Sequence, residues 1–160
     1  MSANATSLSV AQSVSTRRAS SSVAVSPRTS WGRFALRGLA TIVAAVLANT
    51  LFYYVGGQLV SYDPDFIMLA TPGGTIVMTV FPAIVAVLLY AGLVRFTPHA
   101  ARIFSIVSAL VLVASFVPDF TYVPTVPGST DAQIAILLAM HVVAAAVIVR
   151  MLTSGSLPRK

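Results

Sequence analysis

Four long apolar stretches separated by short polar connections constrain this 160-residue chain more than any other feature of its sequence. They cover about residues 34–58, 75–94, 98–117 and 131–152. Each is long enough for a helix that crosses a hydrocarbon core of about 30 Å. Only 9% of the residues are charged, whereas a soluble domain carries about a quarter. The sequence therefore predicts an all-α membrane protein, a four-transmembrane-helix bundle.

The charged residues form two sets that alternate along the chain. The basic residues are Arg17, Arg18, Arg28, Arg33, Arg37, Arg95, Arg102, Arg150, Arg159 and Lys160, and the acidic ones are Asp63, Asp65, Asp119 and Asp131. Every basic residue lies near a chain end or at the connection between the second and third stretches, and every acidic one lies in or directly beside the other two connections. Because basic residues concentrate on the cytoplasmic side of a membrane, the pattern predicts an N-in/C-in topology with both termini cytoplasmic.

Residues 1–30 are rich in Ser, Thr and Ala, and they lack the apolar periodicity of a helix. Such a composition cannot bury a core, so we expect a disordered cytoplasmic tail. Two alternatives remain, a twin-arginine signal beginning at Arg17 and Arg18 or a processed organellar targeting segment. The transmembrane domain is then expected over residues 31–153, followed by a short basic C-terminal tail over residues 154–160.

Short motifs predict where the helices begin and end. A Thr side chain can cap a helix, and proline is tolerated at the first helical position but stops a helix later. We expect Thr75 to cap the second helix, and Thr97, followed by Pro98, to cap the third. The third helix is expected to end at Pro118. For the fourth helix we expect a capping box formed by Thr130 and Gln133.

Three polar side chains fall near the middle of apolar stretches, at Asn49, Ser108 and His141. Polar groups are costly in lipid, so each indicates a packed or functional position. The small residues Ala144 and Ala145, one turn after His141, favour an orientation of His141 toward another helix. Pro82 also leaves the carbonyl of Met78 without its usual helical donor. Together these groups predict a mid-membrane polar layer.

The layer has two interpretations. In the favoured one, its residues form hydrogen bonds between helices, each worth about 0.6 kcal/mol on average. In the other, His141 binds a ligand or relays protons. The second interpretation is weakened because all four acidic residues are expected in the connections, which leaves no acid inside the membrane. Without cysteine, a metal-binding cluster, a phosphate loop or a paired nucleophile and base, we expect no cofactor, no catalytic residue and no metal site.

Two segments carry a resemblance to a known family. The second stretch with its basic turn, "GGTIVMTVFPAIVAVLLYAGLVRFTPHAARIF", and the fourth, "LLAMHVVAAAVIV", are similar to those of an uncharacterised family of small bacterial four-helix integral membrane proteins, a domain of unknown function. The likeness covers roughly residues 34–152. It implies the same four-span body, a bacterial plasma membrane location and a histidine in the last span, matching His141. It implies no catalytic or binding residue.

The sequence favours a non-enzymatic structural or interaction protein, or a subunit of a membrane complex. Its partners would be the lipid bilayer and either copies of itself or another membrane protein, packed through alanine-rich faces. The alternative is a small-molecule carrier, or a quinone- or haem-binding membrane subunit, that uses the polar layer around His141. Nucleic acid is not expected, because the basic residues are spread along the chain and form no patch with interleaved aromatic residues.

Overall fold

The structure of this chain is a computed structural model, and it describes residues 31–154. Within that range the chain is helical and contains no strand. The helices are α2 (Trp31–Leu59), α3 (Pro72–Phe96), α4 (Ala100–Thr121), the short 3-10 helix η1 (Val123–Thr125) and α5 (Asp131–Thr153). The prediction of four long helices is confirmed. The predicted tail at residues 1–30, and residues 155–160 of the predicted C-terminal tail, lie outside the described residues.

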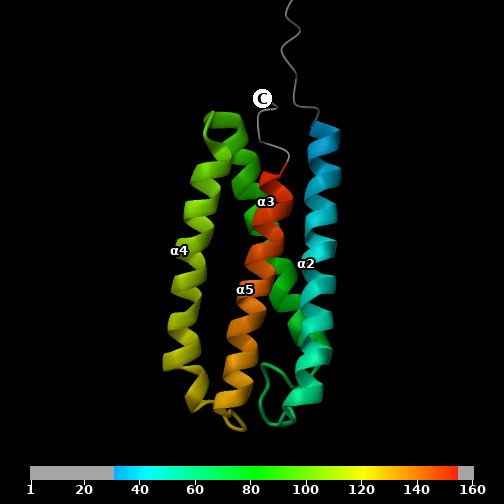
Figure 1. The fold of residues 1–160 in the computed structure, drawn as a ribbon, viewed down its shortest axis with the longest axis vertical. Helices are drawn as coiled ribbons and strands as arrows, with labels where there is room; N and C mark the ends of the chain where they lie inside the picture. The colour runs from blue at the N-terminus through cyan, green and yellow to red at the C-terminus, as the bar shows by residue number, and fades with distance from the viewer. Residues whose placement is uncertain (1–30, 155–160) are drawn as a thin grey trace, which may run out of the picture. The chain divides into compact units, whose positions relative to one another are not determined.

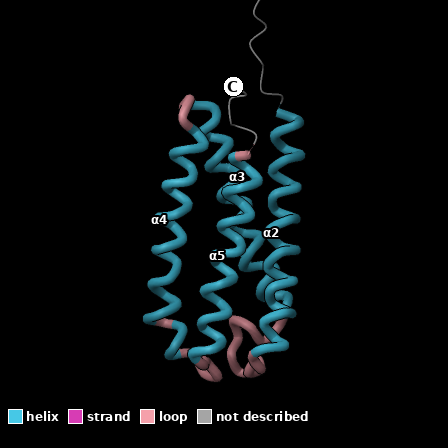
Figure 2. The backbone as a smooth tube through the Cα atoms, in the orientation of Figure 1, coloured by secondary structure: helices cyan, strands magenta, loops and turns pink. Residues whose placement is uncertain are grey.

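Each long helix runs antiparallel to the one before it (Figure 1). α2 contacts both α3 and α5, and α5 contacts α4 as well. The connections of residues 60–71 and 122–130 lie at one end of the bundle, and the turn between α3 and α4 lies at the other (Figure 2). Residues near the end of α4 are therefore level with the first half of α5, although the two segments belong to different helices.

All four long helices are long and apolar enough to cross a membrane. Their large apolar side chains point outward in many places, as Leu47, Leu88 and Leu110 do with about two thirds of their surface exposed. The buried positions of α2 are instead small or polar, and recur every three or four residues: Gly38, Thr41, Ala45, Asn49, Tyr53 and Gly56. Small residues let helices approach closely, which is how helices pack when lipid removes the usual hydrophobic driving force.

The connection at residues 60–71 folds back over one end of the bundle. Phe66 and Leu69 are fully buried there, and the hydroxyl of Tyr53 on α2 donates to the carbonyl of Leu69 at 3.0 Å. Gly128, in the other connection, packs against Asp63 and Phe66 with a φ of 74°. The two connections thus close this end of the bundle together.

Two predicted helix starts are displaced in the structure. α3 begins earlier than expected, at Pro72, because Thr71 is the residue that caps it, through a bond of 3.4 Å from the amide of Gly74. Thr75 is buried inside α3 and does not cap it. α4 begins at Ala100 with His99 as its N-cap and no side-chain cap, because Thr97 accepts from the amide of His99 in the preceding turn.

The start of α5 agrees with the capping prediction only in part. Thr130 is its N-cap and accepts from the amide of Gln133 at 3.3 Å. The side chain of Gln133 does not turn back to the amide of Thr130, because it donates to the carbonyl of Gly128 at 3.2 Å. The expected cap by Thr130 is present. The side chain of Gln133 does not complete the capping box and bonds α5 to the preceding connection.

The predicted end of the third span at Pro118 is wrong. Pro118 lies inside α4, which continues to Thr121. The amide of Tyr122 donates to the carbonyl of Pro118 at 2.8 Å, and this bond satisfies an acceptor that would be costly to leave unpaired in an apolar environment. Asp119 is therefore a helical residue rather than part of a connection.

Candidate ligand-binding cavity

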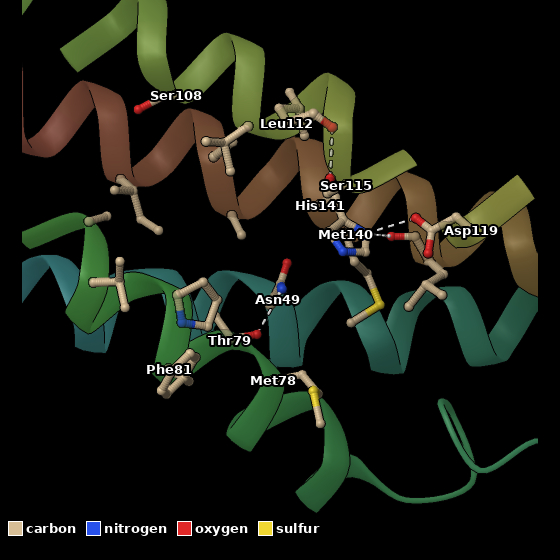
Figure 3. A pocket seen from close by; sticks show the side chains of 18 of the residues that line it. Asn49, Met78, Thr79, Phe81, Ser108, Leu112, Ser115, Asp119, Met140 and His141 are labelled. Carbon is tan, nitrogen blue, oxygen red and sulfur yellow. Dashed lines mark hydrogen bonds and ion pairs between the residues drawn. The ribbon is translucent and has the colours of Figure 1, made fainter. Parts of the chain in front are cut away.

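A cavity of about 580 Å³ lies among α3, α4 and α5, and α2 contributes Asn49 to its wall (Figure 3). Most of the lining is aliphatic or aromatic. The polar side chains among the lining residues are Asn49, Thr75, Thr79, Ser108, Ser115, Asp119, Tyr122 and His141. A volume of this size, with a few polar groups in an apolar wall, is typical of small-molecule sites.

Asp119 and His141 form the main polar contact in this wall. Oδ2 of Asp119 lies 3.3 Å from Nδ1 of His141, and the Asp119 side chain is 6% exposed against 36% for His141. The same Nδ1 lies 2.9 Å from the carbonyl oxygen of Leu137, one turn earlier in α5. Because two oxygens face Nδ1, this nitrogen carries the ring proton, and in a neutral imidazole Nε2 is left as an acceptor.

The presence of Asp119 corrects the expectation that no acid lies inside the apolar spans. Asp119 falls within the third candidate span, which extends from Ala100 to Thr125, and it is 4% exposed. The helix continues past Pro118, and this turns Asp119 onto the same face as Ser115, four residues earlier. The antiparallel packing of α4 and α5 then brings Asp119 to His141.

A second polar contact links α2 to α3. Nδ2 of Asn49 donates to the hydroxyl oxygen of Thr79 at 2.9 Å, and that hydroxyl donates to the carbonyl of Thr75 at 2.8 Å. Asn49, Thr75 and Thr79 are each at most 5% exposed. Oδ1 of Asn49 is buried and accepts no hydrogen bond from residues 31–154.

The three residues of the predicted polar layer all line this cavity. Asn49 and His141 face it from α2 and α5 in Figure 3, whereas Ser108 lies farther along α4. At a rise of 1.5 Å per residue, Ser108 is about 16 Å from Asp119 along the helix axis. Asn49 bonds to Thr79, and His141 contacts Leu137 and Asp119. Pro82 lies inside α3, and both Pro82 and Met78 line the cavity.

Sequence reasoning missed two residues of the site, Asp119 and Thr79. The signal for Asp119 is present in the sequence, because Ser108, Leu112, Ser115 and Asp119 continue one helical spacing of three and four residues. Pro118 obscured this signal by indicating a helix end. Thr79 follows Thr75 by one turn in the same way, within a stretch that is otherwise apolar.

Of the three buried atoms of the cavity wall without a hydrogen-bond partner among the described residues, two can only accept, and the third is the hydroxyl oxygen of Thr75, which can donate or accept. Oδ1 of Asn49 and Oδ2 of Asp119 both lack a hydrogen-bond donor among the described residues. Buried polar atoms without a partner are uncommon in folded proteins, and each calls for an explanation. Within residues 31–154 there is also no group of three or more His, Asp or Glu side chains placed to hold a metal ion. The arrangement is suited to accepting hydrogen bonds from a bound molecule.

One comparison with known proteins gives a match. The model of a family of unknown function, DUF6069, matches residues 29–156, which is most of the chain. The match covers all four long helices and therefore every residue that lines the cavity. Comparisons with curated proteins and with solved structures gave no match.

Proposed function

The chain belongs to this family of unknown function, DUF6069, and we propose that it is a non-enzymatic membrane protein that binds a lipid-soluble small molecule. The observation that carries the proposal is the cavity among α3, α4 and α5, whose apolar wall contains the buried groups Asn49 and Asp119 and the partly exposed His141. Pockets of about 300–1,000 Å³ with a few convergent polar groups are the usual form of a small-molecule site.

Most of the polar groups lie toward one end of the cavity, and Ser108 lies farther along α4. Asp119, His141, Asn49 and Thr79 gather toward the end closed by the connections, and the lining continues toward Phe104 at the other end of α4. This arrangement favours an elongated amphiphilic ligand. Its polar group would lie near Asp119 and its apolar part along the bundle.

The rim of the cavity supports entry from the bilayer. Met78 and Phe81 on α3 are each 71% exposed, and Val111 on α4 is 62% exposed, yet all three line the cavity. The cavity therefore reaches the outer surface of the bundle between apolar side chains. A lipid-soluble molecule can pass such a rim without losing its apolar surroundings.

The proposal includes an orientation in which the four helices cross a bacterial plasma membrane with both termini in the cytoplasm. The alternation of basic and acidic connections supports it. Because the chain contains no cysteine, single cysteines can report the topology directly. Asp65 and His99 are exposed residues in opposite connections, so Asp65→Cys and His99→Cys form a matched pair.

In intact cells, a membrane-impermeant maleimide should label Asp65→Cys. It should label His99→Cys only after the membrane is permeabilised. Labelling of His99→Cys in intact cells, with Asp65→Cys protected, would show that the proposed orientation is inverted. Labelling of both, or of neither until permeabilisation, would show that α2 and α3 do not cross the membrane as proposed.

Ligand binding is tested by filling the cavity. Ala144 lines it, whereas the neighbouring Ala146 is exposed and does not. Purified protein in lipid nanodiscs would be titrated with the fluorescent probe 1-naphthylmethanol, and protein-free nanodiscs would give the background. Ala144→Phe should weaken binding about tenfold or more, because a phenyl ring occupies the probe's volume, and Ala146→Phe should leave it unchanged. Equal binding by the parent and both variants would refute the cavity as the site.

Association with a partner protein is a second prediction of the sequence, and the cavity does not require it. Ala45 and Ala83, two of the alanines in the spans, are fully buried between helices of the same chain. If the chain forms a homo-oligomer or joins a membrane complex, other surfaces must provide the interface. The mass of the detergent-solubilised protein, measured by light scattering, would reveal association with itself.

A further inference from the structure

We infer that the ligand of this cavity is a lipophilic cation, a protonated amine attached to an apolar body, which donates N–H hydrogen bonds to Asp119. The inference rests on the proposed function and adds the chemical class of the ligand. It follows from three properties of the cavity, which are the type of polar atom it offers, its charge and its shape.

One oxygen of the Asp119 carboxylate lacks a hydrogen-bond donor among the described residues. Its Oδ2 is buried and accepts no hydrogen bond, although Nδ1 of His141 lies 3.3 Å away. The shorter contact of that nitrogen is with the carbonyl of Leu137, at 2.9 Å. A ring nitrogen carries a single proton, and here the proton is directed to Leu137. Asp119 therefore keeps a free acceptor that a bound molecule can use.

Two further polar atoms of the cavity wall are acceptors. Nδ2 of Asn49 is already bonded to Thr79, and Oδ1 of Asn49 is left without a donor. In the neutral ring of His141, Nε2 is an acceptor. A ligand that only accepts hydrogen bonds would leave these atoms unpaired, whereas a ligand with several N–H donors would satisfy them.

The charge of the cavity lining favours a positively charged donor over a neutral one. The titratable residues among its described lining are Asp119, Tyr122 and His141, and no Lys or Arg is part of that lining. When Asp119 is ionised, it places a negative charge in a largely apolar wall. A buried charge is strongly destabilising unless it is paired. An ammonium group supplies both the pairing charge and the hydrogen bonds, whereas a neutral alcohol supplies only the latter.

The shape of the cavity completes the description of the ligand. Phe81, Pro82 and Val85 on α3 and Val111 on α4 all line the cavity. These side chains offer apolar surface to a ring or a short alkyl chain beside the amine. An anion is disfavoured, because Asp119 would repel it at the end of the cavity where most of the polar lining residues lie.

Three probes of nearly the same shape but different charge test the inference. They are 1-naphthylmethylammonium, 1-naphthylmethanol and 1-naphthoate, each titrated at neutral pH into the full-length protein in nanodiscs of zwitterionic lipid. We expect the ammonium probe to bind about tenfold or more tightly than the alcohol, as a charge-assisted hydrogen bond implies. We expect naphthoate to bind most weakly. This comparison needs no variant, so it does not depend on whether a variant folds.

Asp119→Asn keeps the side-chain volume and removes the charge. In this variant the ammonium probe should lose its advantage over the alcohol, while the affinity for the alcohol changes little. Asp65→Asn removes the same charge from an exposed residue outside the cavity and should leave the preference as it is in the parent. If Asp119→Asn keeps the full preference for ammonium, the assigned residue is wrong.

The remaining outcomes separate the two proposals. If the alcohol binds as tightly as the ammonium probe, and Ala144→Phe weakens both, the cavity is a ligand site but the inference of a cation fails. If naphthoate binds most tightly, the pair carries a positive charge on His141 and the inference is also wrong. If no probe binds in a way that Ala144→Phe weakens, both the proposed function and this inference are overturned.

Discussion

Nδ1 of His141 lies 3.3 Å from Oδ2 of Asp119, and this contact joins the middle of α5 to the last turn of α4. A carboxylate that is 6% exposed lies beside an imidazole in a helix that is otherwise largely apolar. The pair accounts for the position of His141 in the fourth span. It also places an ionisable group in the wall of the cavity.

The stability of the bundle should depend on this pair. We expect His141→Ala to lower the free energy of unfolding by about 1–3 kcal/mol, because the buried Asp119 then loses the polar imidazole that lies 3.3 Å from it. The double variant Asp119→Asn/His141→Ala should lose less than the sum of the two single variants, because neither residue then leaves a buried charge behind. Unfolding in mixed detergent, followed by circular dichroism, measures all three. Strict additivity would show that the two side chains do not interact.

The bond from Asn49 to Thr79 should hold α2 against α3. Asn49→Leu and Thr79→Val should each destabilise the bundle by about 0.6–1.7 kcal/mol, the range measured for hydrogen bonds between membrane helices. Ser105→Ala is the control, because the Ser105 hydroxyl donates to Ala101 within its own helix. The same unfolding assay applies. A control variant as unstable as Asn49→Leu would argue that the contact between the helices has no special role.

Gly128 should not tolerate a side chain. Its φ of 74° is unfavourable for other residues, and a Cβ there would lie 2.8 Å from the amide nitrogen of Phe66. Gly128→Ala should therefore cost more than about 1 kcal/mol, from strain and from separation of the two connections. Gly92 has nothing within 4 Å of an added Cβ and lies inside α3, so Gly92→Ala should be neutral or slightly stabilising. Equal effects of the two substitutions on melting temperature would contradict this account.

Arg37 should stabilise the end of α5. Its Nε donates to the carbonyl of Met151 at 2.8 Å, and its Nη2 donates to the hydroxyl of Ser154 at 3.1 Å. Arg37→Ala should increase amide hydrogen exchange in the last turn of α5 by roughly tenfold, since a hydrogen bond to a charged group is worth about 1.5–3 kcal/mol. Mass spectrometry resolves this segment. Arg102→Ala removes an exposed arginine on α4 and should leave the exchange of α5 unchanged.

The fold could be predicted from the sequence because a long apolar helix can be recognised from its own residues alone. Twenty apolar residues in a row satisfy their own backbone hydrogen bonds and need no knowledge of their neighbours. The start of α5 after Thr130 could likewise be predicted from neighbouring residues, because a capping side chain bonds within one turn of the helix. The end of α4 was mistaken, because the effect of Pro118 depends on the acceptors that would be left unpaired if the helix stopped there.

The candidate site was predicted less completely. Asn49, Ser108 and His141 were recognised because a polar residue stands out in an apolar stretch, and all three line the cavity. Their partners could not be deduced, since Thr79 and Asp119 belong to other helices and their depth depends on how those helices are aligned. Asp119 was assigned to a connection because Pro118 indicated a helix end, although the spacing of Asp119 from Ser115 indicated a shared face.

By itself, then, the sequence determined the number of long helices and their approximate extents, because these depend on interactions within a single helix. The tertiary structure decided that Asp119 is buried beside His141, that Asn49 bonds to Thr79 and that a cavity is left among three helices. These features depend on the relative axial position and rotation of separate helices. A shift of about one turn, or 5.4 Å, would leave every local pattern unchanged and would separate each pair.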